Sequence, residues 1–467
     1  MLGAGQTRHG NWVVLTAWVA LLPGVELMRG QELTVQPIAF AMHRSTGGLW
    51  QREAAPISFA GIGARATASY GRWSLTSEAV NMRFVGEDAL DLPNRFMPEQ
   101  GFSWQSRSAG RAEEFDTDHA NAKISYDAGR LIAFAGKFSQ SWGPGLHSLT
   151  LSQKPPSYPQ FGFDWQVLER LHFSYMHAQL VSGLVDSSRD FGDLLGGRFI
   201  QQPRFLAAHR LDVDLFETLT LGLTESVVYG GRGMETIYLI PFVFYWSAQH
   251  NLGDLDNLQM SADLTWRPSS DLKVYGVFVM DEWTPGRTFS EDDHNWFAWQ
   301  AGLAGRSLLA NSDRLIIEAS WTDQRVYRHR VPVNDYYSHR YPLGHWTGPH
   351  AQSLYAAYVY PLAGMRLMGS YLYAKRGEVT EQMTIDKYRN MRPDRFSGPV
   401  KAFESIELKL GRRIYRDLWG LLGVSVITWT DDAALDHPTE LTKTSINLGF
   451  YYNFNLKSYD ISLIQPH

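Results

Sequence analysis

Apolar and polar residues alternate with a period of two through most of the chain, and this pattern constrains the fold more than any other feature of the sequence. In residues 258–267, for example, Ser261 and Asp263 fall on one face, whereas Met260 and Leu264 fall on the other. Such alternation predicts β-strands with one polar and one apolar face. Two architectures use it: a barrel in lipid turns the apolar faces outward, and a soluble sandwich turns them inward.

The lengths of the connections distinguish these two architectures. Short turns fall at 70–72, 127–130, 216–218, 268–271, 361–364 and 415–417. Long polar connections fall at 283–295, 327–349, 376–400 and 431–442. Alternation of short periplasmic turns with long extracellular loops is typical of outer-membrane barrels, whereas a soluble domain rarely contains several loops longer than ~15 residues. We therefore predict an all-β fold: a transmembrane antiparallel β-barrel of about 18 strands in the outer membrane of a Gram-negative cell.

The strand count leaves the identity of the last strand open. The hairpins joined by short turns, together with an additional strand at 33–43, give an odd number, whereas bacterial barrels have an even number of strands. Either the barrel ends with a strand at 445–454, or 459–464 is the last strand and an earlier segment is not a strand.

The first 30 residues are typical of a signal peptide. An apolar run at 12–22 lies between Arg8 and Pro23, and it is shorter than the ~20 apolar residues of a transmembrane helix. A buried N-terminal strand is the alternative. We predict a signal peptide at 1–30 and one barrel domain at 31–467, within which 85–118 forms a plug, an external loop or a small accessory element.

Composition narrows the classes of function. The chain contains no cysteine and has a formal net charge of -5, which excludes thiolate chemistry and argues against nucleic acid as a partner. No serine and histidine form a recognisable nucleophile element, and the histidines of 327–350 match no compact zinc pattern. We expect a non-enzymatic protein without metal or cofactor, with outer-membrane lipid as a partner.

Three motifs occur in order along the first part of the barrel. Residues 137–152 read KFSQSWGPGLHSLTLS, and residues 238–246 read YLIPFVFYW. A Gly-Asp-x-Asp-Asn element and a strand that ends in Asp-Glu follow. The motif residues are Trp142, Gly143, Pro144, Gly145, Gly253, Asp254, Asp256, Asn257, Asp281 and Glu282. The ordered set resembles the capsule-assembly Wzi family, and the resemblance covers residues 115–285 well.

The resemblance implies an outer-membrane barrel of about 18 strands that acts as a lectin-like protein and attaches capsular or other surface polysaccharide to the cell. Homologues can be monomers, so the resemblance also implies a monomer. The best-known members carry a small helical bundle on the periplasmic side. This sequence shows no convincing amphipathic bundle, and it ends in Gln-Pro-His rather than in the usual terminal aromatic residue.

Polysaccharide binding requires aromatic rings that stack on the C–H faces of sugars, and polar groups that pair with their hydroxyls. Acidic sugars also require basic partners. The candidates in the predicted extracellular loops are Trp283, Trp296, Tyr336, Tyr337, Arg340, Trp346, Arg392 and Arg395. For a tryptophan at a strand end, the alternative role is the aromatic girdle at the membrane interface. Trp346, in the middle of a loop, is the best single candidate.

Two of the motifs have structural interpretations. The glycines and proline of Trp142–Gly145 permit a sharp turn, and the alternative is that Trp142 lines the mouth of the lumen. The segment 253–257 favours Asx-type turns over a calcium site, which needs ~6–8 oxygen ligands.

The main hypothesis for function is a protein that binds or organises surface, capsular or extracellular polysaccharide. A porin-like channel for small solutes is the alternative, and a soluble periplasmic sandwich or propeller is a third possibility. On the predicted lumen faces, Asp263, Glu318, Glu407 and Lys409 would either tune an open channel or form paired networks that fill it.

Overall fold

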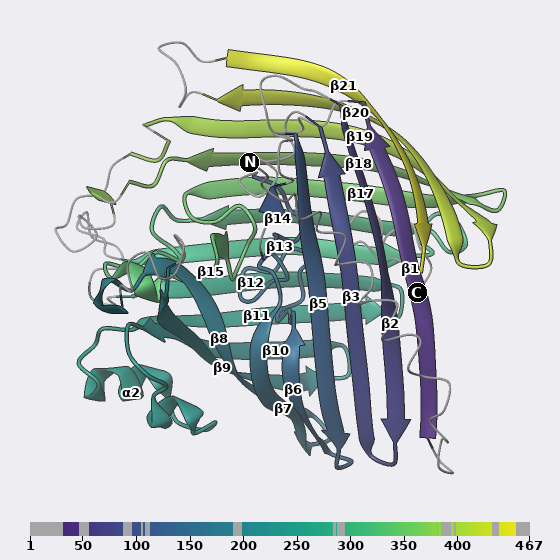
Figure 1. The fold of residues 1–467 in the computed structure, drawn as a ribbon. Helices are drawn as coiled ribbons and strands as arrows, with labels where there is room; N and C mark the ends of the chain where they lie inside the picture. The colour runs from purple at the N-terminus through teal and green to yellow at the C-terminus, as the bar shows by residue number, and fades with distance from the viewer. Residues whose placement is uncertain are drawn as a thin grey trace, which may run out of the picture.

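The computed structural model describes residues 31–45, 56–86, 96–103, 106–107, 113–189, 199–283, 286, 295–380, 382–383, 394–396, 398–431 and 439–453. The predicted signal peptide therefore lies outside the described residues, and so does 459–464. Figure 1 shows the strands as a continuous wall that wraps round into a barrel.

The main sheet is antiparallel and contains 19 strands, one of which is the two-residue β4 (Ser106–Arg107). The other 18 form the barrel: β1 (Gln31–Arg44), β2 (Ile57–Tyr70), β3 (Trp73–Val85), β5 (Glu114–Asp127), β6 (Leu131–Phe138), β7 (Tyr158–Leu168), β8 (Leu171–Val185), β9 (Gln201–Phe216), β10 (Leu219–Gly230), β11 (Asn257–Ser269), β12 (Leu272–Glu282), β13 (Trp296–Arg306), β14 (Arg314–Thr322), β17 (Ala351–Leu362), β18 (Met365–Gly377), β19 (Val400–Tyr415), β20 (Leu418–Asp431) and β21 (Thr439–Tyr452).

The barrel is closed by the pairing of its first and last strands. Strands β1 and β21 run antiparallel, with Ala39 opposite Tyr452 and Arg44 opposite Asn447. Gln31, at the start of β1, lies opposite Tyr70 beside a short turn, and Tyr452 lies opposite Leu418 beside another. The start of β1 and the end of β21 therefore both lie on the short-turn side of the barrel, as an even number of strands requires. The predicted barrel of about 18 strands is confirmed.

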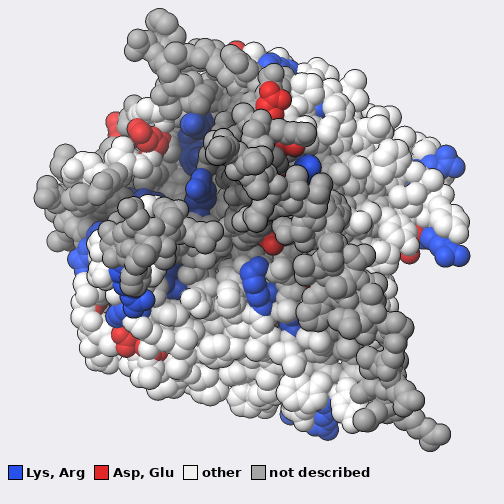
Figure 2. Space-filling model, in the orientation of Figure 1, with Lys and Arg blue, Asp and Glu red and all other residues white. Residues whose placement is uncertain are grey.

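The two faces of each strand differ as the alternation predicts. On β11, Ser261 and Asp263 are buried inside the barrel, whereas Leu264 and Trp266 are about half exposed on the outside. Outward-facing residues elsewhere are also apolar and exposed, such as Leu422 on β20. In Figure 2, broad areas of the barrel surface carry few charged side chains. The apolar faces therefore point outward, as in a barrel that contacts lipid.

Helices are few and short in the described part of the chain. They are η2 (Ser187–Arg189), η4 (Thr236–Leu239), α2 (Tyr245–Asn251) and η6 (Pro332–Asn334). None of the described helices has the length and apolar character needed to cross a membrane. Two short strands, β15 (Tyr337–Ser338) and β16 (Tyr341–Pro342), form a separate hairpin.

Candidate binding site

Two long connections fold into the barrel and fill its lumen. We call residues 139–157, between β6 and β7, the first plug loop, and residues 323–350, between β14 and β17, the second plug loop. Leu149 and Leu151 of the first loop share one buried cluster with Tyr327 and Leu343 of the second. The same cluster includes inward-facing wall residues such as Met176. The loops therefore pack against each other and against the inner wall.

Hydrogen bonds join the two plug loops directly. The Tyr327 hydroxyl donates to the carbonyl oxygen of Leu149 at 2.6 Å, and the Tyr336 hydroxyl donates to that of Thr150 at 2.9 Å. The amide of Ser152 donates to the carbonyl oxygen of Leu343 at 2.6 Å. Because buried backbone carbonyls need partners, these contacts fix the two loops as one unit.

Glu318, on β14, holds the first plug loop to the wall. Its carboxylate accepts hydrogen bonds from the amides of Leu146 and His147, at 2.8 and 3.0 Å, and from the Tyr275 hydroxyl at 2.6 Å. The His147 ring lies 2.9 Å from the same carboxylate. A Cβ atom at Gly145 would lie 2.9 Å from a Glu318 oxygen and 2.3 Å from the Gln300 amide oxygen. The Trp-Gly-Pro-Gly motif thus needs a glycine where the chain approaches the wall.

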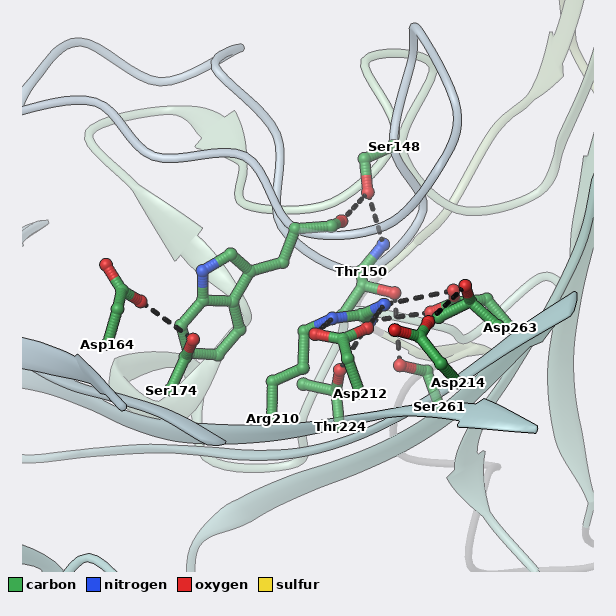
Figure 3. Close-up of polar contacts among 12 residues, drawn as sticks. Ser148, Thr150, Asp164, Ser174, Arg210, Asp212, Asp214, Thr224, Ser261 and Asp263 are labelled. Carbon is green, nitrogen blue, oxygen red and sulfur yellow. Dashed lines mark hydrogen bonds and ion pairs between the residues drawn. The ribbon is translucent and has the colours of Figure 1, made fainter. Parts of the chain in front are cut away.

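A second polar network occupies the inner wall below the first plug loop (Figure 3). The Arg210 guanidinium makes paired hydrogen bonds to Asp212 and Asp263 at 2.6–3.0 Å. Thr150 of the plug donates to the Ser261 hydroxyl at 3.1 Å. On β19, Lys409 lies 2.7 Å from a carboxylate oxygen of Glu407. These inward charges are paired with one another.

Residues 96–103, part of the stretch 85–118, dock on the plug. The Lys154 ammonium donates to the carbonyl oxygens of Met97 and Glu99, at 2.8 and 2.7 Å. The amide of Gly101 donates to the carbonyl oxygen of Lys154 at 2.8 Å. Burial lowers the pKa of Lys154 to about 7, although the charge of Glu99 opposes this shift.

A polar pocket of about 170 Å³ lies at the loop end of β11 and β12. Its lining residues come from α2, from the connection between α2 and β11, from the start of β11, from the end of β12 and the residue after it, and from the second plug loop. They are Trp246, Gln249, Asp254, Asp256, Asn257, Leu258, Met260, Met280, Asp281, Glu282, Trp283, His329 and Arg330. We call this cavity the rim pocket. Two of the sequence motifs, separated by β11 and β12, meet in it.

Three buried polar atoms that belong to lining residues have no hydrogen-bond partner. They are the side-chain oxygen of Gln249, one carboxylate oxygen of Asp256 and the side-chain nitrogen of Asn257. The other carboxylate oxygen of Asp256 accepts from Arg232 and from the Tyr238 hydroxyl, each at 2.7 Å. Because an unpaired buried polar group is costly, these two acceptors and one donor beside the rim pocket would gain from a polar partner.

Two tryptophans give the rim pocket apolar surface. Trp246 is 50% exposed and Trp283 is 53% exposed. The connection before β11 is fixed by the second plug loop: Arg330 donates to the carbonyl oxygen of Asp254 at 2.9 Å, and Asn334 donates to that of Leu255 at 2.7 Å. Aromatic faces and hydrogen-bonding groups thus lie together on a supported backbone.

The predicted polysaccharide-binding residues do not come together in one place. Trp283 lines the rim pocket. Trp296, Tyr336 and Trp346 are buried between plug and wall. Trp346 lies in the second plug loop, where its ring centroid is 4.9 Å from that of Phe96.

The remaining predicted residues lie elsewhere. Tyr337 belongs to β15 and packs against the plug cluster, and Arg340 is exposed beside that hairpin. Arg395 donates to the carbonyl oxygens of Thr322 and Ala351, each at 2.7 Å. Arg392 lies outside the described residues. Among these four, only Arg340 is exposed in the described part of the chain.

Several pocket residues were not among the sequence candidates. Gln249 and Trp246 lie in or next to the Tyr238–Trp246 motif, whereas His329 and Arg330 come from the second plug loop. The position of Trp246 at the end of an aromatic motif was an available signal. The direction in which a long loop folds, which brings Arg330 to the pocket, has no local signature.

Comparison with known proteins identifies the family. The family model "Capsule assembly protein Wzi" matches residues 63–432. Wzi of Escherichia coli, an outer membrane protein involved in group 1 capsule assembly and a carbohydrate-binding β-barrel, is 16% identical, with a TM-score of 0.54. The alignment covers 90% of this chain and 85% of that one. A search of curated proteins finds no significant match.

Other solved barrels are more distant. Pseudomonas aeruginosa OpdK is 10% identical, with a TM-score of 0.48, over 90% of this chain and 98% of that one. Acinetobacter baumannii OccAB2 is also 10% identical, with a TM-score of 0.47, over 92% and 99%. The closed barrel with its apolar outer surface is an outer-membrane protein of a Gram-negative cell. The family match over most of the described barrel shows that the chain belongs to the capsule assembly protein Wzi family.

Proposed function

We propose that this protein binds surface polysaccharide at the rim pocket and so helps to hold the polymer at the cell surface. The observation that carries the proposal is the set of unpaired buried atoms on Gln249, Asp256 and Asn257 beside two half-exposed tryptophans. Sugar hydroxyls both donate and accept hydrogen bonds, so they match the two acceptors and the donor of this set. The carbohydrate binding of the E. coli relative supports the same class of ligand.

Binding of a sugar at the rim pocket needs only non-covalent contacts. Hydroxyl groups of the sugar donate to Gln249 and Asp256 and accept from the Asn257 amide, while a ring face stacks on Trp283. A single sugar unit in a pocket of about 170 Å³ gives weak affinity. A polymer that engages several barrels at once is held far more strongly, because each further contact is made at a high effective concentration.

A filled lumen distinguishes this proposal from the porin-like alternative. The inward charges are paired, and the plug loops are joined to each other and to the wall. A porin needs a continuous aqueous passage. The described parts of the plug loops occupy that path, so we expect little steady conductance.

The test measures polysaccharide binding by the refolded full chain in lipid nanodiscs, with polysaccharide purified from the producing cell as the probe. Trp283→Ala should weaken binding about 5- to 30-fold, which corresponds to about 1–2 kcal/mol. Trp73→Ala is the matched control, because Trp73 is equally exposed but lies on the short-turn side. Equal binding by wild type and Trp283→Ala would reject the rim pocket, and no binding by wild type would reject the function.

A further inference from the structure

One long connection folds over the outside of the barrel instead of entering it. We call residues 231–256, between β10 and β11, the outer segment; it contains η4 and α2. Tyr238, Tyr245 and Ala248 of this segment are fully buried. They pack in one cluster with the wall residues Phe205, Ala207, Val227 and Tyr229. The outer segment therefore has a defined inner side.

The wall residues under the outer segment belong to the outward face of the barrel. On β9, Leu206 and Ala208 point into the lumen, where they join the plug cluster. Phe205 and Ala207 alternate with them, so they point outward. Figure 1 shows α2 outside the outline of the barrel wall. The outer segment thus lies on the surface that faces lipid elsewhere on the barrel.

Glu225, an outward-facing carboxylate on β10, fastens the outer segment. It accepts hydrogen bonds from the amides of Tyr245 and Trp246, at 2.8 and 2.7 Å, and lies 3.1 Å from the His209 ring. Amide groups without partners are costly in lipid, and so is a charged side chain on the lipid face of a barrel. The contact between Glu225 and α2 removes both costs, because each group pairs with the other under the segment.

Residues 240–244 of the outer segment present an exposed apolar row. Ile240, Phe242 and Phe244 are 52%, 65% and 53% exposed. The Phe242 ring lies 5.0 Å from Phe173 and 6.3 Å from Trp165, measured between ring centroids. These two rings project outward from β8 and β7. The apolar row of the segment is therefore continuous with the lipid-facing surface of the wall.

We propose that the outer segment is embedded in the membrane, with Ile240, Phe242 and Phe244 among the acyl chains of the lipid. Exposed apolar surface of this kind is unfavourable in water and favourable in hydrocarbon. Trp246 follows the row and lines the rim pocket, so its ring lies where apolar and polar surroundings meet, a position tryptophan favours at membrane interfaces. The rim pocket then opens close to the membrane surface.

The absence of cysteine from the chain makes a direct test possible. Phe242→Cys and Phe244→Cys are labelled with a nitroxide in the refolded full chain in lipid vesicles. Electron paramagnetic resonance then compares the collision of each label with oxygen and with a water-soluble nickel chelate. Leu422→Cys, outward-facing on β20, is the lipid control, and Ser187→Cys, exposed in η2 on the loop side, is the water control.

We expect both labels on the outer segment to resemble the Leu422 label, with a collision rate with oxygen several-fold above that with the nickel chelate. Labels that resemble the one at Ser187 would overturn the proposal. A band that shifts on boiling in gel electrophoresis verifies that each variant is folded. Polysaccharide binding is not part of the readout, so the result is independent of the function proposed for the rim pocket.

Discussion

The first plug loop and the outer segment are held by the same kind of contact, a strand carboxylate that accepts hydrogen bonds from backbone amides, on opposite faces of the barrel wall. Glu318 points inward and accepts hydrogen bonds from two consecutive amides of the plug loop, while Glu225 points outward and accepts from two consecutive amides of the outer segment. Each carboxylate also lies near a histidine ring. The difference lies in what surrounds the contact: a filled lumen in one case and the lipid-facing wall in the other.

In both cases a carboxylate on a strand holds a connection on its own side of the wall. Glu318 holds a connection inside the barrel, and Glu225 holds one against the outer wall. Both loops also carry apolar side chains that pack against the wall, such as Leu149 inside and Tyr245 outside. The comparison predicts that the inner contact is the stronger, since it also holds Tyr275.

The largest effect is expected from Glu318→Ala. The change leaves two amides and the Tyr275 hydroxyl buried without their acceptor, at a cost of about 3–5 kcal/mol in the free energy of unfolding. Urea unfolding in vesicles measures it, and planar-bilayer recordings should show conductance that the wild type lacks. Glu318→Gln keeps one acceptor oxygen, so its stability and its conductance should lie between those of the wild type and of Glu318→Ala. If Glu318→Ala shows no conductance and its free energy of unfolding is unchanged, Glu318 does not hold the plug.

A smaller and local effect is expected from Glu225→Ala. The loss of the shared acceptor should loosen the outer segment by about 1–3 kcal/mol and leave the barrel closed. Limited proteolysis of the folded protein should then cut within 231–256 faster than in the wild type, with an unchanged shift on boiling. Glu225→Gln is the matched control. If cleavage of the alanine variant is no faster, packing alone holds the segment.

The smallest effect is expected in the pH dependence of stability, through Lys154. Burial holds its pKa in the folded protein at about 7, below the ordinary value of 10.5. Between these values the unfolded chain binds more protons than the folded one, so the free energy of unfolding rises with pH. We expect Lys154→Met to reduce the rise in the free energy of unfolding between pH 7 and 8 by about 1 kcal/mol. An identical rise in both proteins would mean that Lys154 carries no such shift.

The sequence predicted the faces of the strands better than the paths of the loops. Once the fold is a barrel in lipid, a period of two places Asp263 and Glu318 on the inward face, and both are buried there. Trp346 was the preferred sugar-binding residue because it lies in the middle of a polar loop, yet it is buried against Phe96. A polar composition does not distinguish a loop exposed to water from a loop inside the barrel, because polar groups that pair with one another are stable in either place.

One signal for the outer segment was present in the sequence. On β10, Glu225 interrupts an outward row that includes Leu223 and Val227. A carboxylate in a lipid-facing row requires a partner, and the structure supplies it from α2. Residues of the rim pocket such as Asp256 and Trp283 belong to motifs that the sequence already singled out, whereas the meeting of those motifs depends on strand pairing.

The filling of the lumen also has a consequence for folding. The hydrogen bond between Tyr327 and Leu149 joins residues 178 positions apart, and that between Tyr336 and Thr150 spans 186. The strands from β7 to β14 lie between the two plug loops in the chain. Contacts of such long range form slowly, so we expect the plug to be completed late in folding. A conductance that decays after the barrel inserts into a bilayer would be the sign of that late step.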